Sequence, residues 1–363
     1  MRTTVWRVLA GAVCVAVLAC RSPTVSSEEA ATPAAGRRTP APTVGAVEGF
    51  GAATKGGAGG RVITISEANT DAVRAAFSDA RTGNVVIRFA VTEPIRLDKM
   101  IPHLTGPNVT IEGNGATIDG TNLKEQVALL DIRTHDVIVR DLRLRNGYDN
   151  LRVQGPEAHD VVIDHVSSTG ARDDGVAIGY GAHDVTVQWC LLAGNTRGLF
   201  SKYDGTRNLS IHHTWIQKSW ARSPLISGAA TVDVRNVIVE DWTLWGARFE
   251  DGASGNVVGS LFMLSPHAVG LGGKPAAALH LKKAGPVYLA DNVYRGAVAT
   301  AATGSAPAAL AAPAVATLPV AEMEPLVRAR AGCLPRDGVD AAYVALRQGW
   351  RVDKTDPLRI GAK

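Results

Sequence analysis

The chain has 363 residues, of which 46% are hydrophobic and 20% are charged, with 38 glycines and a formal net charge of +4. This composition excludes a disordered or fibrous protein and is typical of a globular chain with many tight turns. The lysines and arginines are scattered and do not alternate with aromatic residues, so no nucleic-acid partner is expected. The four cysteines show neither a disulfide framework nor the spacing of a metal site.

The first 20 residues predict an export signal, because arginines at positions 2 and 7 precede an apolar run that is too short to cross a bilayer. The run ends in VLAC, which resembles the lipobox of bacterial lipoproteins, in which Cys20 would be lipidated. An ordinary cleaved signal peptide is the alternative. Residues 21–45 are rich in Pro, Ala, Ser and Thr and are expected to form a disordered tether. We therefore expect an extracytoplasmic protein, either secreted or lipid-anchored at the outer membrane or cell surface, with no other membrane contact.

A short phrase recurs from residue 107 onward and predicts the fold. Its copies are PNVTIEGN from Pro107, HDVIVRDL from His135, HDVVIDHV from His159, HDVTVQWC from His183, RNLSIHHT from Arg207, RNVIVEDW from Arg235 and GNVVGSLF from Gly255. Apolar and polar residues alternate in each copy, which indicates a strand with one buried face. A leucine-rich repeat has a similar period, but these units carry Val and Ile and show no helical half. The repeat therefore predicts an all-β, single-stranded parallel β-helix over residues 46–363.

The second position of every copy is Asn or Asp, a residue type that bonds to the backbone at turns. Stacking would align these residues in one column, which we interpret as a repeated bend without chemistry: Asn108, Asp136, Asp160, Asp184, Asn208, Asn236 and Asn256. The histidines before three of them (His135, His159 and His183) are expected to lie at the same bend.

A second column has no structural reason in the repeat. Fourteen residues after the start of three phrases lie Asp149, Asp173 and Arg197, and one further coil with a slip of one residue adds Arg222. A solvated ladder of ion pairs is one reading. The other is a groove for an anionic polymer, because neighbouring carboxylates can share a hard cation and arginines bind carboxylates with two hydrogen bonds. Asp174 can replace or assist Asp173.

Six motifs, in order, resemble the pectate and pectin lyases of the first polysaccharide lyase family. They are EGFGAATKGGAGGRVITI, NVTIEGNGATIDG, DNLRVQG with VVIDHVSSTG, HDVTVQWC with NLSIHHTWI, ARSPLISG, and RAGCLPRDGVDAAYV. The resemblance runs from about Val47 to Trp350. It implies a secreted, right-handed parallel β-helix that cleaves polygalacturonate (pectin) by β-elimination.

The resemblance also implies roles for single residues. Asp149 and Asp173, with Asp174 beside the latter, match calcium ligands, and Arg222 matches the catalytic arginine. Arg197 and Lys202 lie near the position of a substrate-binding lysine, and Arg197 fits the repeat better. The chain departs from the family's pattern at Gly147, Ala177 and Ser227, where a carboxylate, a second carboxylate and an arginine are usual, so fewer charged calcium ligands are expected. 

Two alternatives stay open. ARDDGVAI resembles the paired aspartates of polygalacturonases, which are hydrolases, and a non-catalytic pectin-binding β-helix would also explain the missing ligands. The Ala/Pro-rich segment 296–320 is expected to be a loop, followed by a short helix that ends near Trp350. We expect the protein to act as a monomer.

Overall fold

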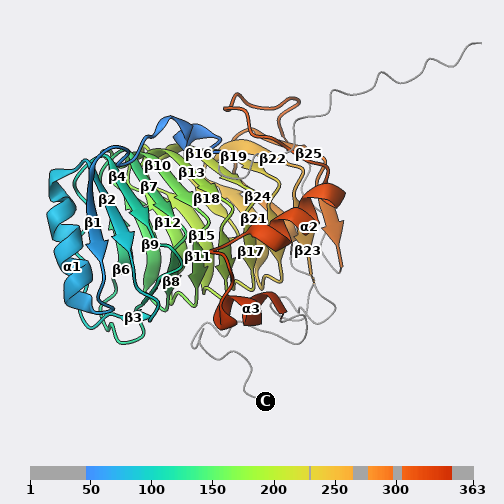
Figure 1. The fold of residues 1–363 in the computed structure, drawn as a ribbon. Coiled ribbons are helices and arrows are strands. Elements are labelled where there is room, and N and C mark those ends of the chain that lie inside the picture. Colours follow the sequence, from blue (N-terminus) through green and yellow to red (C-terminus); the bar gives the residue numbers. More distant parts are fainter. Residues whose placement is uncertain (1–45, 229, 265–276, 297–304, 346–363) are drawn as a thin grey trace, which may run out of the picture. The chain divides into compact units, whose positions relative to one another are not determined.

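The computed structural model describes residues 46–228, 230–264, 277–296 and 305–345. They form a right-handed parallel β-helix, in which successive coils contribute strands to three parallel sheets of ten, nine and seven strands (Figure 1). All of the described residues belong to one compact unit. The predicted signal peptide and tether lie outside the described residues, as does Trp350. Within the described part of the chain, no helix has the length and apolar character needed to cross a membrane.

Sheets A, B and C are named here by their strands. Sheet A contains β1 (Arg61–Ile65), β2 (Val85–Phe89), β4 (Val109–Glu112), β7 (Val137–Arg140), β10 (His159–Asp164), β13 (His183–Gln188), β16 (Arg207–His212), β19 (Thr231–Arg235), β22 (Ser254–Val258) and β25 (Val287–Ala290). Sheet B contains β3 (Ile95–Arg96), β5 (Thr117–Asp119), β8 (Arg143–Arg145), β11 (Ser167–Thr169), β14 (Leu191–Ala193), β17 (Trp215–Gln217), β20 (Ile238–Glu240), β23 (Leu261–Met263) and β26 (Val293–Arg295). Sheet C contains β6 (Ala128–Ile132), β9 (Asp149–Gln154), β12 (Asp174–Gly179), β15 (Arg197–Lys202), β18 (Leu225–Ser227), β21 (Trp245–Glu250) and β24 (Ala277–Lys282).

The repeated phrase forms sheet A, as the alternation predicts. Val137, Val161, Val185, Leu209 and Val232 pair in register from coil to coil, and all five are buried. Because each apolar side chain lies on its counterpart in the next coil, the interior is a set of continuous apolar stacks.

The N-terminal end of this interior is covered by α1 (Thr70–Asp79), which lies beside β1 (Figure 1). The Asn69 side chain accepts a hydrogen bond from the Ala72 amide at 2.8 Å and so caps the helix. Val73 and Phe77, one helical turn apart, are fully buried against the core. The 3₁₀ helices η1 (Phe50–Ala53) and η2 (Ala80–Thr82) flank this region in the sequence.

The predicted bend column is correct for five of its seven members. Five residues have left-handed backbone, with φ between 52° and 56°: Asn108, Asp136, Asp160, Asp184 and Asn208. The prediction is wrong for Asn236 and Asn256. Asn236 follows β19 in a second left-handed column, together with His165 and His213 in earlier coils, and Asn256 lies inside β22, paired with Asp233. The repeated phrase places these two residues 28 and 20 residues after their predecessors in the column, whereas paired residues of the later coils are 23 apart.

The three histidines of the first column stack on one another with ring centroids 4.9 Å apart. Each Nδ1 lies 2.6–2.9 Å from a carboxylate oxygen of the aspartate that follows it. These contacts are local to the bend.

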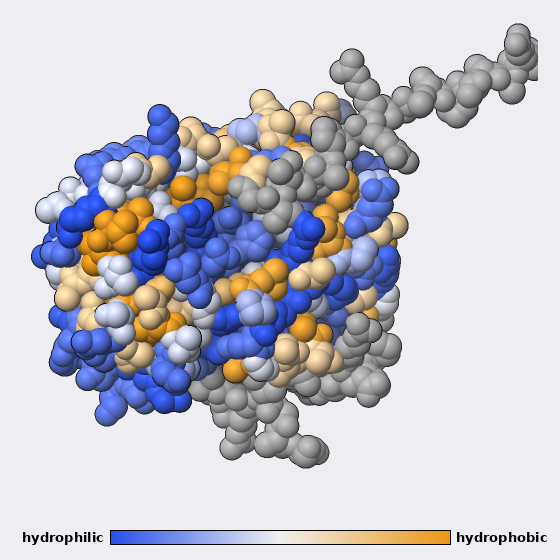
Figure 2. Space-filling view, viewed as in Figure 1, coloured by the Kyte–Doolittle hydropathy of each residue, from blue (hydrophilic) through white to orange (hydrophobic). Residues whose placement is uncertain are grey.

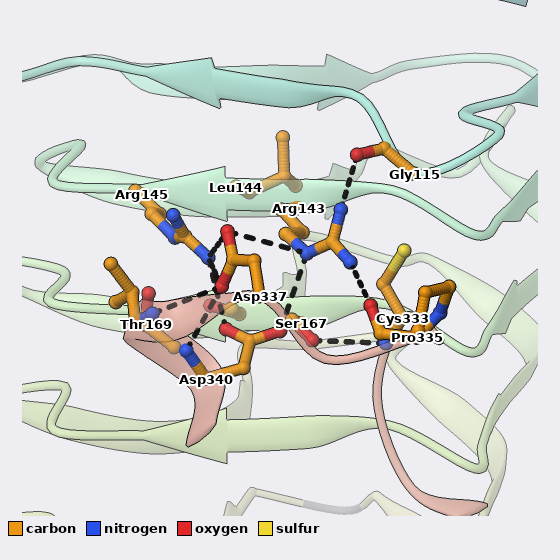
Figure 3. A network of polar contacts seen from close by, with 12 residues as sticks. Gly115, Arg143, Leu144, Arg145, Ser167, Thr169, Cys333, Pro335, Asp337 and Asp340 are labelled. Atoms are coloured by element: carbon orange, nitrogen blue, oxygen red, sulfur yellow. Dashed lines mark hydrogen bonds and ion pairs between the residues drawn. The ribbon is translucent and has the colours of Figure 1, made fainter. Parts of the chain in front are cut away.

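The C-terminal segment packs on sheet B. The described residues 305–319 contain no helix or strand, and α2 (Val320–Arg330) and α3 (Gly338–Ala345) follow. Gly194 has φ +63°, and a Cβ there would lie 2.2 Å from the Tyr343 ring, so a glycine is needed for α3 to dock. Beside it, Arg143 and Arg145 of β8 form ion pairs with Asp337 and Asp340 (Figure 3).

Candidate functional site

Five of the six predicted site residues gather where the strands of sheet C begin, and the sixth, Lys202, ends β15. Leu151 pairs with Val176 across β9 and β12, which places Asp149 level with Asp174. Asp174 pairs in turn with Arg197, and Arg197 bridges to Ala221. The structure therefore corrects the predicted register by one residue at the middle coil.

Asp173 lies just before β12, and its amide donates to the Tyr148 carbonyl at 2.7 Å. Arg222 follows Ala221, with left-handed backbone at φ 59°. Asp173 and Arg222 therefore lie beside the other site residues, although each is one residue away from the position that pairs between strands.

The three aspartates lie close enough to act together. One carboxylate oxygen from each of Asp149, Asp173 and Asp174 lies within 4.8 Å of those of the others. Asp149 and Asp174 are 2% and 4% exposed, and the Asp149 carboxylate accepts a hydrogen bond from the Asp174 amide at 3.0 Å. Three carboxylates so close together need positive charge nearby.

That charge comes from three arginines, one for each aspartate. Arg222 donates through one nitrogen to both oxygens of Asp174, at 2.9 and 2.8 Å. Arg197 is ion-paired with Asp173. Arg152 is ion-paired with Asp149, its Nε donating at 3.0 Å. The group therefore carries as many guanidinium groups as carboxylates.

The burial and the charges together shift several pKa values. Burial raises the pKa of Asp174 to about 7, against the opposing effect of the Arg222 charge. The pKa of Arg197 is lowered, by burial first and by the nearby Arg222 charge second. Burial also acts to lower the pKa of Arg152, but the Asp149 carboxylate outweighs it and the pKa is raised. Two of the guanidinium groups thus lie close enough to repel each other.

A hollow of about 240 Å³ opens beside this group on the outer face of sheet C. Asp149, Asp173, Asp174, Lys202 and Arg222 line it together. Figure 2 shows hydrophilic surface across the middle of this face. Five of the six predicted site residues thus contact one hollow, and the sixth, Arg197, reaches it through Asp173.

The departures from the family's pattern have visible consequences. Ala177 lines the hollow where a carboxylate would otherwise lie, level with Arg152. At Gly147 a Cβ would lie 2.5 Å from the Asp149 carbonyl oxygen and 2.6 Å from the Leu129 side chain, so this backbone has no room for an aspartate. The site therefore keeps three carboxylates.

These three carboxylates fit a calcium ion in donor type and spacing. Calcium takes oxygen ligands at about 2.3–2.6 Å and tolerates irregular geometry. The Asp149 and Asp174 carboxylates are nearly buried, which would hold them in place. All three aspartates are already neutralised by an arginine. An ion could be held by Asp149, Asp173 and Asp174 if the arginines turned toward another anion.

The lining residues that the sequence analysis missed include one arginine and three aromatic residues: Arg152, Tyr180, Phe200 and Tyr203. Arg152 had a signal, since DNLRVQG places it three residues after Asp149. Phe200 lies level with Ala177 and packs under Arg222, whose guanidinium carbon lies 3.9 Å from the ring centroid. Only the register of the coils could have indicated Phe200, and no repeat marks the two tyrosines.

Comparisons with known proteins place the chain among relatives of one kind. No family model matches. The chain is 30% identical over 240 residues to a probable pectate lyase C of Neosartorya fischeri, which covers 60% of this chain and 53% of that protein. It spans about half the length of the curated relatives that it matches.

Solved structures share the fold. A pectate lyase from Bacillus sp. N165 in complex with trigalacturonate superposes with a TM-score of 0.61 at 18% identity, over 79% of this chain and 98% of that one. A pectate lyase bound to a hexasaccharide gives a TM-score of 0.58 at 15% identity, over 80% and 98% of the two chains. In sequence the chain is similar to proteins named as probable pectate lyases, and it shares its fold with solved pectate lyases.

Proposed function

We propose that this protein is a pectate lyase that binds polygalacturonate along sheet C and cleaves it by β-elimination. The observation that carries the proposal is the hollow in which Asp149, Asp173, Asp174, Lys202 and Arg222 meet. The carboxylate of an acidic sugar can replace the aspartate carboxylates that now neutralise the arginines. The names of the curated relatives support the same activity.

Arg197 and Lys202 would bind the carboxylates of the polymer. Arg197 is a quarter exposed and can turn from Asp173 to a substrate carboxylate, which it can bind with two hydrogen bonds. Lys202 lines the hollow from the far end of β15 and offers a point charge. Both would place a uronate ring against Arg222.

Arg222 would act as the base. The Arg222 guanidinium first gives up a proton to water, and the neutral guanidine then accepts the proton α to the uronate carboxylate. The electron pair of that C–H bond forms a carbon–carbon double bond. The C4–oxygen bond breaks, and the departing glycosidic oxygen takes a proton from water. The Phe200 ring, whose centre lies 3.9 Å from the guanidinium carbon, holds the guanidine in position for this transfer.

Calcium is part of the proposal, held by Asp149, Asp173 and Asp174 and completed by the substrate. When bound, it would polarise the uronate carboxylate and so acidify the neighbouring proton. We also propose that the protein works outside the cytoplasm, as its N-terminal sequence indicates.

A non-catalytic, pectin-binding protein is the second candidate. The observation that favours it is the complete neutralisation of the three aspartates by Arg152, Arg197 and Arg222, which competes with calcium. An inverting hydrolase is disfavoured, because such an enzyme separates its two carboxyl groups by roughly 6.5–9.5 Å and these oxygens lie within 4.8 Å.

One experiment separates the three. The purified protein is incubated with polygalacturonate, with calcium or with a chelator. A lyase yields an unsaturated product that absorbs ultraviolet light, and calcium dependence abolishes it under chelation. New reducing ends without that absorbance would indicate a hydrolase, and retention of the polymer without any product would indicate a binding protein.

A further inference from the structure

Tyr180 and Tyr203 form an exposed aromatic pair at the far end of β12 and β15. Their rings stack with centroids 4.1 Å apart at an interplanar angle of 13°. They are 53% and 40% exposed, and they are the aromatic members of the exposed large hydrophobic side chains among the described residues. Exposed apolar rings gain little from folding itself.

Both tyrosines also have left-handed backbone, with φ 56° and 82°. Most left-handed residues in the described chain are Asn, Asp or Gly, which adopt this conformation readily. Trp189 shares it but is buried, so packing compensates for its strain. Tyr180 and Tyr203 stand at the left-handed bend that follows the strands of sheet C, where Gly155, Gly228, Asp251 and Lys283 lie in other coils. The bend belongs to the fold, and an exposed aromatic residue at it is what sets these two coils apart.

The pair stands between two hollows. Tyr180, Tyr203 and Lys202 line the hollow of the proposed active site and also a neighbouring hollow of about 500 Å³. A Cβ at Gly179 would lie 2.7 Å from the Lys202 carbonyl oxygen and 3.1 Å from the Tyr203 ring, so the glycine lets both approach. A polymer that leaves the first hollow on this side must cross the tyrosine rings.

The charges of the neighbouring hollow differ from those of the site. Its lining contains one cation, Lys202, and two carboxylates, Asp204 and Asp251. The Lys202 ammonium lies 5.6 Å from the centre of the Tyr203 ring, over its face. Two carboxylates disfavour a uronate anion but accept hydrogen bonds from sugar hydroxyls, and flat rings offer a stacking surface.

We propose that Tyr180 and Tyr203 form a sugar-binding subsite next to the active site, and that it takes an uncharged pyranose ring, such as a methyl-esterified galacturonate unit. This inference rests on the proposed function, which it deepens. The preferred polymer is then a partly esterified chain, with a free acid in the active site and an ester one step away.

The test compares binding of two polymers, partly methyl-esterified and fully de-esterified polygalacturonate, by affinity electrophoresis. We expect Tyr203→Ala to weaken binding of the partly esterified polymer roughly tenfold and that of the de-esterified polymer less than about twofold. Tyr203→Phe keeps the ring and should bind as the unchanged protein does. Tyr288→Ala, which removes a partly exposed tyrosine from sheet A, is the matched control.

Failure of the subsite and failure of the proposed function give different results. If Tyr203→Ala leaves binding of both polymers unchanged, or weakens binding of the de-esterified polymer as much, the subsite is wrong while the proposed function stands. If the unchanged protein retains neither polymer, the proposed function fails and the subsite fails with it. Tyr203 is exposed, so its variants are expected to fold, and circular dichroism checks this.

Discussion

Two groups of aspartate and arginine lie on different sheets of the β-helix, and both have equal numbers of positive and negative side chains. On sheet B, Arg143 and Arg145 pair with Asp337 and Asp340, and we call this group the clasp (Figure 3). On sheet C, the site group joins Asp149, Asp173 and Asp174 to three arginines. The chemistry is the same, and the surroundings differ.

Exposure separates the two groups. In the clasp, the Arg143 and Arg145 side chains are 6% and 8% exposed and Asp340 is fully buried, while Asp337 at its rim is 35% exposed. At the site, the side chains of Arg152, Arg197 and Arg222 are 20–27% exposed beside a hollow. Buried partners cannot be exchanged without a large loss of stability, whereas partly exposed arginines can turn to an incoming anion. We therefore expect the clasp to serve stability and the site group to serve binding.

The largest expected effect is on activity at the site. Arg222→Ala removes the proposed base, and general base catalysis contributes roughly 10²–10⁴-fold, so the rate of unsaturated product formation should fall about a thousandfold. The control is Arg207→Ala, which removes an exposed arginine of sheet A. Full lyase activity in Arg222→Ala would show that another group removes the proton.

The next effect is on stability at the clasp. Asp340→Asn leaves Arg143 and Arg145 with one buried partner fewer, and the free energy of unfolding should fall by about 3 kcal/mol, measured by urea denaturation. Asp79→Asn breaks an exposed pair with Arg61 and should change it by less than about 0.5 kcal/mol. Equal losses in the two variants would mean that burial does not distinguish the clasp.

Much of the fold could be predicted from the sequence, because a period of 24 residues places equivalent side chains in contact. The same counting brought Asp149, Asp173 and Arg197 together. It missed by one residue at the middle coil, since the step from Asp149 to its partner Asp174 spans 25 residues. Coil lengths vary with the bends, and the sequence does not mark where the extra residue lies.

The arginine pairing and the clasp could not be predicted in this way. Asp337 lies 192 residues from Arg145 and outside the repeat, so no period relates them. Arg222 reaches Asp174 across two coils, 48 residues away. Such contacts depend on three-dimensional packing of long side chains, which hydrophobic alternation does not encode.

A smaller effect is expected when the balance of charges at the site is changed. Ala177→Asp adds a fourth carboxylate to the hollow and makes the group net negative, so calcium affinity should rise about tenfold, measured by calorimetry. The control is Ser305→Asp, which adds a carboxylate at an exposed position. Ser168→Asp would not serve, because Ser168 is buried. Unchanged affinity would indicate that Arg152, level with residue 177, captures the new carboxylate.

The smallest effect is a pH dependence in the clasp. Burial acts to raise the pKa of Asp337, but hydrogen bonds from the Asp340 amide and from Arg145 outweigh it, and the pKa lies below the usual 3.8. The ionised form therefore stabilises the fold, and this contribution is present above the ordinary pKa and is lost as the pH falls through the lowered one. Between pH 5 and pH 2.5 the unfolding temperature should fall a few degrees further in the unchanged protein than in Asp337→Asn. If the unfolding temperature falls equally with pH in both proteins, the charge of Asp337 does not hold the C-terminal segment. Asp340 would then be the only clasp carboxylate whose charge stabilises the fold.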